Sequence, residues 1–200
     1  GLGLNMSVVN PYWNKTKGEM AEECNGKAKI LMIVSDKNIT NQIERLRGFN
    51  AAIQTYSEMK IADILECGSS ILTAQKLVTK VMEEQPEINA IFCAEGTGTG
   101  ACCYVMEKQN RKVGASMHII GYDYNSVTKR CIEEGYLSAC IQQDSRQMGE
   151  LAVQILDKYL SERIRPAKII HTHASLIRRE NMEEAEKIDS ENVEVEWNYY

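Results

Sequence analysis

The feature that most constrains this chain is a regular alternation of short apolar runs with longer amphipathic segments, starting at residue 28. Residues 28–35 (AKILMIVS) are almost continuously apolar, which is typical of a strand covered on both faces. Similar runs follow at residues 60–67, 89–94, 117–123, 137–143 and 167–177. Segments with helical spacing separate them, at residues 41–53, 73–84, 100–109, 127–135 and 149–160. The alternation predicts an α/β fold: an open, mostly parallel sheet with helices on both faces, in a three-layer sandwich.

Local signals refine the expected helices. Asn41 and Glu44 are spaced as a capping box at the start of the helix at 41–53. Gly135 stands where a helix would end. In the helix at 149–160, helical spacing predicts an inward face made of Leu151, Ala152, Ile155, Leu156 and Tyr159.

Charge and hydropathy exclude some partners. The formal net charge is −5 and the pI is near 5.4, whereas a nucleic-acid binder needs a basic surface, so we expect no nucleic acid. The first residues, GLGLNMSVV, have no basic start and no long apolar core. Since no stretch approaches the roughly 18 apolar residues of a spanning helix, we expect a chain that is not itself membrane-spanning.

The cysteines bear on the cellular compartment. Their number is odd and no CxxC motif occurs, so complete pairing in disulfides is excluded. Because several lie inside apolar patterns, buried free thiols are the expectation, with a partial disulfide or a reactive thiol as the alternative. Free thiols indicate a reducing environment, which keeps a cytoplasmic location open. The cysteines are Cys24, Cys67, Cys93, Cys102, Cys103, Cys131 and Cys140.

Polar residues follow the predicted strands. In a parallel sheet the carboxyl ends of the strands meet at one edge, where ligands bind. Acids, amides and one guanidinium at that edge would suit a polyhydroxylated ligand, because sugar hydroxyls both donate and accept hydrogen bonds. Helix capping is the alternative role, and we expect it for Asp36, Ser69 and Asp144. The residues expected at the edge include Arg45, Cys67, Glu95, Asp123, Gln142 and Gln143.

The turn at residues 95–101 (EGTGTGA) allows a second interpretation. Gly96, Gly98 and Ala101 satisfy the permissive G-x-G-x-x-G/A dinucleotide pattern, and Asp123 lies about where a ribose-binding acid would follow. Such a chain would be an NAD-dependent oxidoreductase. However, two strand–helix units precede the turn, whereas the dinucleotide pattern usually opens its domain.

Other catalytic or metal-binding signals are weak. His171 and His173 alternate on one strand, but no third ligand with zinc spacing accompanies them or His118. No histidine is placed to activate Cys67 or Cys93. We therefore expect no metal, no cofactor and no enzymatic activity.

The order of motifs resembles the periplasmic sugar-binding protein family of the ribose-binding type, whose fold is shared with the effector domains of lactose-repressor-type regulators. The resemblance covers residues 26–184. The motifs that carry it are RLRGFNAAI, EINAIFCAEGTGTGA, IIGYD, IEEGYLSACIQQDSRQMGELAVQIL and SLIRRENM.

The resemblance implies roles for particular residues. Arg45 matches the arginine that clamps ligand hydroxyls, Asp123 the aspartate of the Gly-aromatic-Asp motif, and Gln143 the glutamine after the fifth strand. Glu95 is the candidate at a position where the family usually has asparagine. Tyr12 and Trp13 resemble an aromatic segment of the first lobe, and could stack on a sugar or serve in ordinary packing.

The resemblance also predicts a domain organisation. Family members close two lobes over the ligand, and this chain is shorter by about one lobe, so the first lobe is absent or reduced. Residues 1–27 would be a remnant of, or crossover from, that lobe; residues 28–180 the carboxyl-terminal ligand-binding lobe; and residues 181–200 an acidic tail, in which VEVEW either adds an edge strand or stays loose.

The function implied is sugar binding, as the solute receptor of an ABC-type import system or as a sensor domain. Its partner would be a membrane permease or a sensor kinase, and its location extracytoplasmic, in the periplasm or lipid-anchored to the cell envelope. The alternative within the fold is a transcription-regulator effector domain, which would account for the cysteines but would need a DNA-binding helix-turn-helix upstream.

Overall fold

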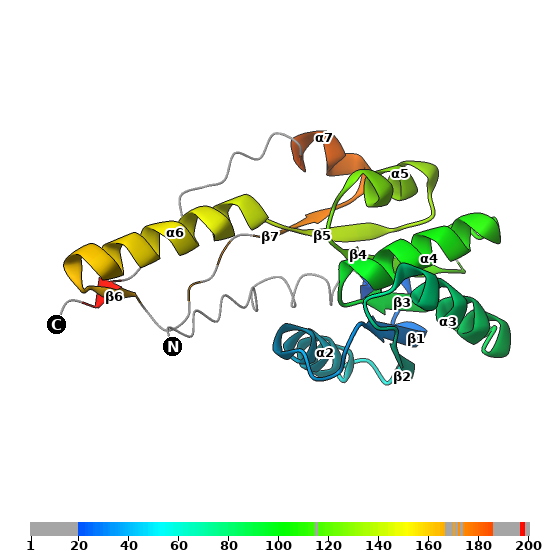
Figure 1. Ribbon diagram of the computed structural model, residues 1–200. Helices are drawn as coiled ribbons and strands as arrows, with labels where there is room; N and C mark the ends of the chain where they lie inside the picture. Colours follow the sequence, from blue (N-terminus) through cyan, green and yellow to red (C-terminus); the bar gives the residue numbers. More distant parts are fainter. Residues whose placement is uncertain are drawn as a thin grey trace.

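The computed structural model describes residues 20–114, 116–166, 170, 172, 174–185 and 197–198 (Figure 1). Its main sheet and the helices that cover it contain β1 (Lys27–Val34), α2 (Thr40–Ile53), β2 (Glu58–Glu66), α3 (Ile71–Glu84), β3 (Ala90–Cys93), α4 (Gly96–Lys108), β4 (His118–Tyr122), α5 (Ser126–Glu134), β5 (Ala139–Gln143) and β7 (Ala174–Ile177). The remaining elements are α6 (Ser145–Glu162), β6 (Arg165–Pro166), η1 (Arg179–Asn181), α7 (Met182–Ala185) and β8 (Trp197–Asn198).

The sheet has six strands in the order β2-β1-β3-β4-β5-β7. All neighbouring pairs are parallel except β5 and β7, which confirms the expected open, mostly parallel sheet. The chain reverses its direction across the sheet between β1 and β3, where Ile30 pairs with Ala90. Such a reversal opens a crevice at the carboxyl ends of the two strands.

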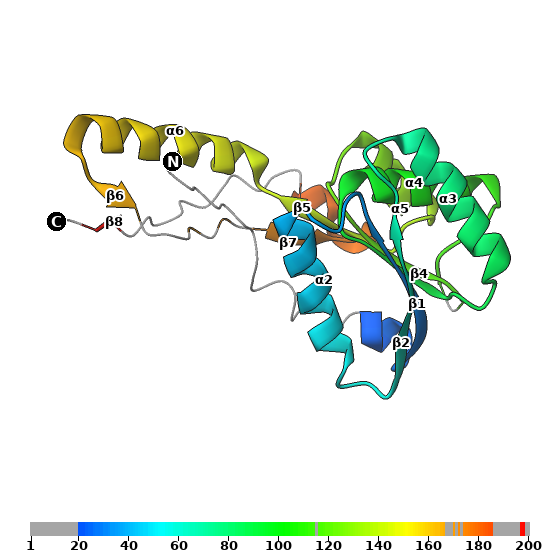
Figure 2. The same cartoon turned by 60° about the horizontal axis from the view of Figure 1, so that its bottom comes forward.

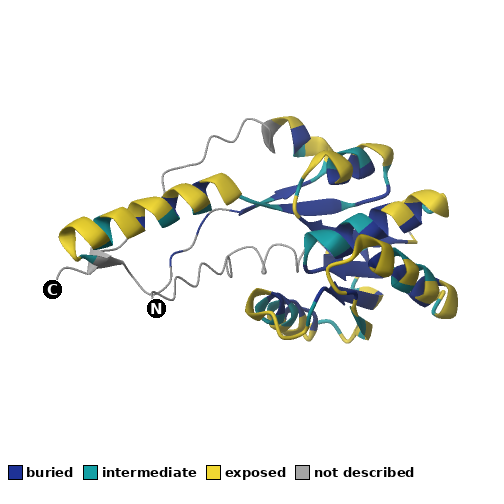
Figure 3. Cartoon of the chain, in the orientation of Figure 1, coloured by how far each residue is buried: buried dark blue, intermediate teal, exposed yellow. Residues whose placement is uncertain are grey.

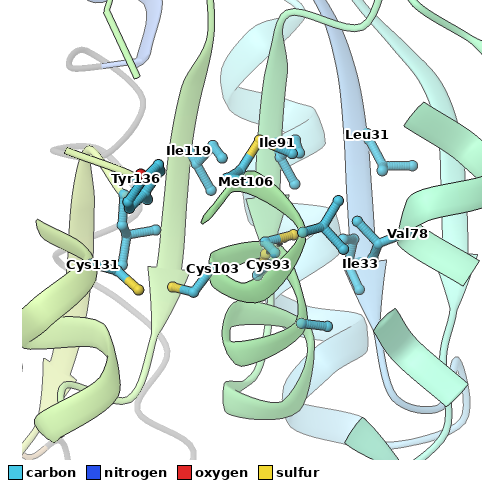
Figure 4. Packing of buried hydrophobic residues seen from close by; sticks show 14 of the residues in the cluster. Leu31, Ile33, Val78, Ile91, Cys93, Cys103, Met106, Ile119, Cys131 and Tyr136 are labelled. Atoms are coloured by element: carbon cyan, nitrogen blue, oxygen red, sulfur yellow. Dashed lines mark hydrogen bonds between the residues drawn. The ribbon is translucent and has the colours of Figure 1, made fainter. Parts of the chain in front are cut away.

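Helices cover both faces of the sheet. Right-handed crossovers on opposite sides of the reversal place α2 on one face and α3, α4 and α5 on the other (Figures 1 and 2). Each face has its own apolar core: Phe49 of α2 packs over Met32 and Phe92, while α3, α4 and α5 pack over residues such as Ile33 and Ile91 (Figure 4). Strands β1, β3 and β4 are consequently mostly buried in the middle of the molecule, whereas most residues of the edge strand β2 are exposed or half-buried (Figure 3).

Helix α6 extends away from the sheet (Figures 1 and 2). Leu151 and Ile155 are buried as expected, but Leu156 is 46% exposed, so its predicted inward orientation is wrong. Leu156 instead shares an exposed apolar stripe with Val153 and Leu160, which are 69% and 59% exposed. Helical periodicity places residues on one stripe, but it does not tell which side of the helix has a neighbour.

Near the carboxyl end, β8 pairs antiparallel with β6 in a two-stranded sheet separate from the main one. Of the segment VEVEW, only Trp197 lies within the described residues. The strand expected at residues 167–177 overlaps β7, which covers Ala174–Ile177. His171 and His173 lie outside the described residues.

The helix starts differ in detail from expectation. Helix α2 has Ile39 as its N-cap, with no capping side chain, so the Asn41–Glu44 capping box is wrong: the helix begins before Asn41, and Glu44 pairs with Arg47 at 3.0 Å. Ser70, not Ser69, caps α3.

Two other end signals are confirmed and one is wrong. Asp144 caps α6 by accepting from Gln147 N at 2.8 Å, and Gly135 ends α5 with a left-handed φ of 78°. The capping role expected for Asp36 is wrong: α2 has no side-chain cap, and the Asp36 carboxylate instead accepts hydrogen bonds from the backbone and side-chain nitrogens of Asn38.

All seven cysteines are buried and free, which confirms the expectation of buried thiols. Over the part of the chain that the structure describes, no helix combines the length and the apolar character needed to cross a bilayer.

Candidate functional site

The carboxyl edge of the sheet brings together three of the residues predicted from sequence. Asp123 follows β4, Gln143 ends β5, and Arg45 reaches this edge from α2 on the neighbouring face. They form a continuous hydrogen-bonded chain: Arg45 Nη2 donates to Gln143 Oε1 at 2.9 Å, and Gln143 Nε2 donates to Asp123 Oδ1 at 2.8 Å. The Gln143 side-chain amide thus bridges the Arg45 guanidinium and the Asp123 carboxylate.

Arg45 is only 4% exposed, and its burial is compensated on several sides. Nη1 donates to the carbonyl of Ala94 at 2.7 Å, and the guanidinium carbon lies 3.9 Å from the centroid of the Tyr122 ring. A desolvated cation over an aromatic face is attracted by the ring quadrupole. The Nε of Arg45 is buried without a hydrogen-bond partner.

The Tyr122 ring that contacts this guanidinium belongs to a row of three aromatic rings. Tyr122 meets Phe92 edge to face at a centroid distance of 6.3 Å, and Phe92 stacks on Phe49 at 4.4 Å. Burial raises the pKa of Tyr122 against the lowering effect of the Arg45 charge, so the phenol stays neutral. Tyr122 was missed in the sequence analysis as a site residue, although the Gly-aromatic-Asp motif contains it.

Asp123 is exposed and has a left-handed φ of 68°, which directs its side chain away from the line of β4. Its backbone is fixed: the N–H donates to Ile141 O at 3.0 Å, and its carbonyl accepts from Asn125 Nδ2 and Thr128 Oγ1. Its carboxylate lies against Gly96, where an ideal Cβ would be 2.7 Å from Asp123 Oδ2. Gly96 therefore makes room for this carboxylate.

Glu95 has a different environment from the other candidates. It is the N-cap of α4, and its carboxylate accepts hydrogen bonds from the backbone N–H groups of Thr97 and Gly98. The Cys67 thiol lies 3.8 Å from Glu95 Oε1, and burial, with the Glu95 charge as the next cause, raises the pKa of Cys67 to about 12. Glu95 is thus engaged in capping, where its charge also complements the helix dipole.

This cap bears on the dinucleotide interpretation. A bound pyrophosphate needs free N–H groups at the start of the helix after the glycine turn. Here Glu95 already accepts from two of those groups, and the missing Cβ of Gly98 gives space to Ile33 and Glu95 rather than to a ligand. The absent side chains of Gly96 and Gly98 therefore leave room for the carboxylates of Asp123 and Glu95.

Thr99 connects the start of α4 to the end of β4. It is fully buried, and its hydroxyl donates to Glu95 O and accepts from Tyr122 N, both at 2.9 Å. An ideal Cβ on Gly121 would lie 2.3 Å from Thr99 Cγ2, so the glycine of the Gly-Tyr-Asp motif is required by this contact. Sequence alone offered no signal for Thr99.

A hollow of about 360 Å³ adjoins the exposed end of this chain of hydrogen bonds. Gln142 Oε1 is buried beside it and has no hydrogen-bond partner, which leaves an acceptor for a donor from outside the protein. The residues that line this hollow are Asp123, Tyr124, Gln142, Gln143, Ser145 and Met148. Tyr12 and Trp13, the predicted stacking pair, lie outside the described residues.

Within the described ranges, no group of three or more His, Cys, Asp or Glu side chains could hold a metal ion. His118 lies at the opposite edge of the sheet, where its Nδ1 is 3.0 Å from Glu23 Oε2.

The fold and this edge define a class: an α/β domain with a mostly parallel sheet, in which polar side chains gather at the carboxyl ends of the strands. The sequence matches the family described as periplasmic binding protein domain over residues 18–163. The chain belongs to this family, as the resemblance in its motifs predicted.

Among solved structures, GanP, a glucose-galactose binding protein from Geobacillus stearothermophilus, aligns with a TM-score of 0.79 and 22% identity over 90% of this chain and 62% of its own. A solute binding protein from Agrobacterium vitis with bound D-fucose aligns with a TM-score of 0.80 and 24% identity over 87% of this chain and 59% of its own. The XylFII–LytSN complex aligns with a TM-score of 0.77, 23% identity and 90% coverage of this chain, and 62% of that chain is covered.

Among curated proteins, the HTH-type transcriptional repressor PurR of Aliivibrio salmonicida is 24% identical over 162 residues, which cover 79% of this chain and 47% of the repressor. The chain therefore spans less than half the length of this relative, and about three fifths of the length of the solved structures.

Proposed function

We propose that this chain binds a neutral sugar or similar polyol at the carboxyl edge of its sheet, through Asp123 and Gln143 with Arg45 behind them. The observation that carries the proposal is the hydrogen-bonded chain from the buried Arg45 to the exposed carboxylate of Asp123. Both Nη groups of Arg45 are engaged within the protein, so its charge acts on the ligand mainly by polarising the Gln143 amide.

The chemistry of the edge favours hydroxyl groups over anions. Asp123 offers an exposed carboxylate and Gln142 an unpartnered acceptor, and both need donors. A ligand hydroxyl donates to one such group while accepting from another, whereas a second carboxylate or phosphate would be repelled. Glu95 lies close by as a cap and contributes negative potential.

We further propose residues 28–180 as one lobe of a two-lobed receptor that closes over its ligand, with residues 1–27 as a remnant of, or crossover from, the other lobe and residues 181–200 as an acidic tail. The exposed apolar stripe of α6 supports this, because such a stripe calls for a covering surface. Closure would desolvate the ligand, so a single lobe is expected to bind weakly.

As a receptor, the domain would act without catalysis and would present its closed form to a membrane permease or a sensor kinase on the extracytoplasmic side of the membrane. The structural likeness to the XylFII–LytSN complex supports the sensor form. The raised pKa of Cys67, which keeps this thiol at the site protonated, supports a binding rather than a nucleophilic role.

A second candidate is the effector domain of a transcription regulator. The similarity to PurR over 79% of the chain favours it, as do seven free cysteines, which suit a reducing compartment. In both candidates the same edge of the sheet binds the ligand.

The test is thermal unfolding with millimolar neutral pentoses, hexoses and inositols, and with NAD(H) alongside. A ligand at 100 times its Kd stabilises the folded state by about 2.7 kcal/mol, which raises the Tm measurably. We expect a sugar-dependent rise that Asp123→Ala abolishes and Asp36→Ala retains, since the Asp36 carboxylate bonds its own loop at Asn38. A rise with NAD(H) alone, or one unaffected by Asp123→Ala, would contradict the proposal.

A further inference from the structure

The hollow beside Asp123 contains polar groups that the hydrogen-bonded chain of the site does not use. Gln142 and Gln143 are consecutive in β5, so their side chains leave the strand on opposite sides. The Gln143 amide bonds Arg45 and Asp123, whereas the Gln142 side chain lines the hollow of about 360 Å³. Because Asp123 also lines it, a ligand held by this carboxylate could extend into the hollow.

The polar part of the hollow offers one acceptor and one donor. Gln142 Oε1 is buried and has no hydrogen-bond partner within the part of the chain that the structure describes. A buried carbonyl oxygen without a donor destabilises the protein, and a ligand N–H or O–H would remove that cost. Ser145, the first residue of α6, is exposed and lines the same hollow, where its hydroxyl can donate.

The hollow also has an apolar part, made by Tyr124 and Met148. Both side chains are half-buried, and Tyr124 packs against the core beneath α3, α4 and α5, which fixes its ring. The unbranched Met148 thioether can adapt to a small apolar group beside it. A sugar hydroxyl could satisfy Gln142 but would leave this apolar surface in contact with water.

The charges around the hollow favour a neutral group in it. The Asp123 carboxylate is already linked to the Arg45 cation through the Gln143 amide. An ammonium group placed against Tyr124 and Met148 would lose hydration that a single amide oxygen does not replace. An acetamido group is neutral and carries an N–H donor, a carbonyl acceptor and a methyl group, which match the acceptor, the donor and the apolar surface of the hollow.

We propose that this hollow is a subsite for an acetamido group, so that the sugar bound at the carboxyl edge is an N-acetylated amino sugar. The ligand N–H donates to Gln142 Oε1, the Ser145 hydroxyl donates to the acetyl carbonyl, and the methyl group packs against Tyr124 and Met148. A neighbouring sugar hydroxyl donates to Asp123. This inference rests on the proposed function, since it names the class of sugar that the same edge selects.

The experiment compares affinities in NMR titrations of the full chain. The probes are N-acetylglucosamine and N-acetylgalactosamine, the parent sugars glucose and galactose, and cationic glucosamine. We expect the N-acetylated sugars to bind on the order of tenfold more tightly than their parents, because a buried acceptor gains a donor, and glucosamine to bind no more tightly than glucose. Saturation transferred from the protein to the ligand should be strongest at the acetyl methyl protons.

Matched variants locate the preference. Gln142→Ala should make the N-acetylated and parent sugars bind equally, whereas Gln109→Ala, at the exposed end of α4, should retain the difference; the NMR spectrum of each variant shows whether it is folded. Equal affinities in the unmodified chain, tighter binding of glucosamine, or a preference that survives Gln142→Ala would overturn the subsite while sugar binding at the edge stands. Absence of binding by every sugar would instead contradict the proposed function, and this inference with it.

Discussion

The position of the Asp123 carboxylate depends on the absence of a side chain at Gly96. Its left-handed backbone and the absent side chain of Gly96 together let the carboxylate lie beside the first turn of α4 while Gln143 holds one of its oxygens. The site therefore depends on a glycine that would make no ligand contact of its own.

Gly96→Ala should consequently weaken ligand binding without unfolding the chain. Its Cβ would lie 2.7 Å from Asp123 Oδ2 and 3.3 Å from Asp123 Cβ, so the carboxylate must move. We expect a loss of sugar affinity of about tenfold or more, which corresponds to about 1.4 kcal/mol, measured by calorimetric titration. Gly100→Ala is the control, because its Cβ meets only the flexible end of Ile71 at 3.3 Å. Equal affinities for the two variants would contradict the account.

At the scale of residues, the sequence predicted that Arg45, Asp123 and Gln143 meet at the carboxyl edge, because each follows a strand, or faces a strand end, within a recognisable motif. It did not reveal that Glu95 caps α4, although an acid directly before a Gly-Thr-Gly helix start is consistent with an N-cap. It also missed Thr99 and Tyr122, whose roles arise from contacts between residues 20 or more positions apart.

At the scale of elements, the junction of α4 and β4 depends on the Thr99 hydroxyl. Gly121→Ala should destabilise the fold, because the new Cβ meets Thr99 Cγ2 at 2.3 Å in a fully buried place. We expect a cost of about 1–3 kcal/mol from overpacking, measured by urea unfolding. Thr99→Ala removes the clashing atoms, so the double variant should be more stable than the sum of the single effects predicts. Strict additivity would show that the contact is not the cause.

The central strands were predictable because continuous apolar runs of five to eight residues fit a sheet covered on both faces. The side of each helix that faces the core was less predictable from the sequence. Leu156 belongs to a regular apolar stripe, but α6 leaves the sheet, so the stripe faces solvent. Likewise, the start of α2 has no side-chain cap, and its position follows from packing rather than from a local signal.

For the whole molecule, the buried thiols predict a loss of stability in alkali. Burial is the main cause that raises the pKa of Cys24 to about 11 and of Cys67 to about 12, from an ordinary value of 9.0. Above pH 9 the unfolded chain releases protons that the folded chain retains, so the free energy of unfolding falls as pH rises toward 11 and 12. We expect Tm to decrease from pH 9 to 10.5, less steeply in a Cys24→Ala/Cys67→Ala variant. A Tm that stays level or rises over this range would contradict the prediction.

The central claim is that the carboxyl edge of the sheet binds a neutral sugar. The most direct measurement is a ¹H–¹⁵N correlation NMR titration of the chain with neutral monosaccharides, because it detects weak binding and locates it. The account predicts saturable shifts concentrated at the amides of residues 95–98, 122–124 and 142–145, and their loss in Asp123→Ala. Saturable shifts located elsewhere, or shifts at this edge with NAD(H) but with no sugar, would contradict it.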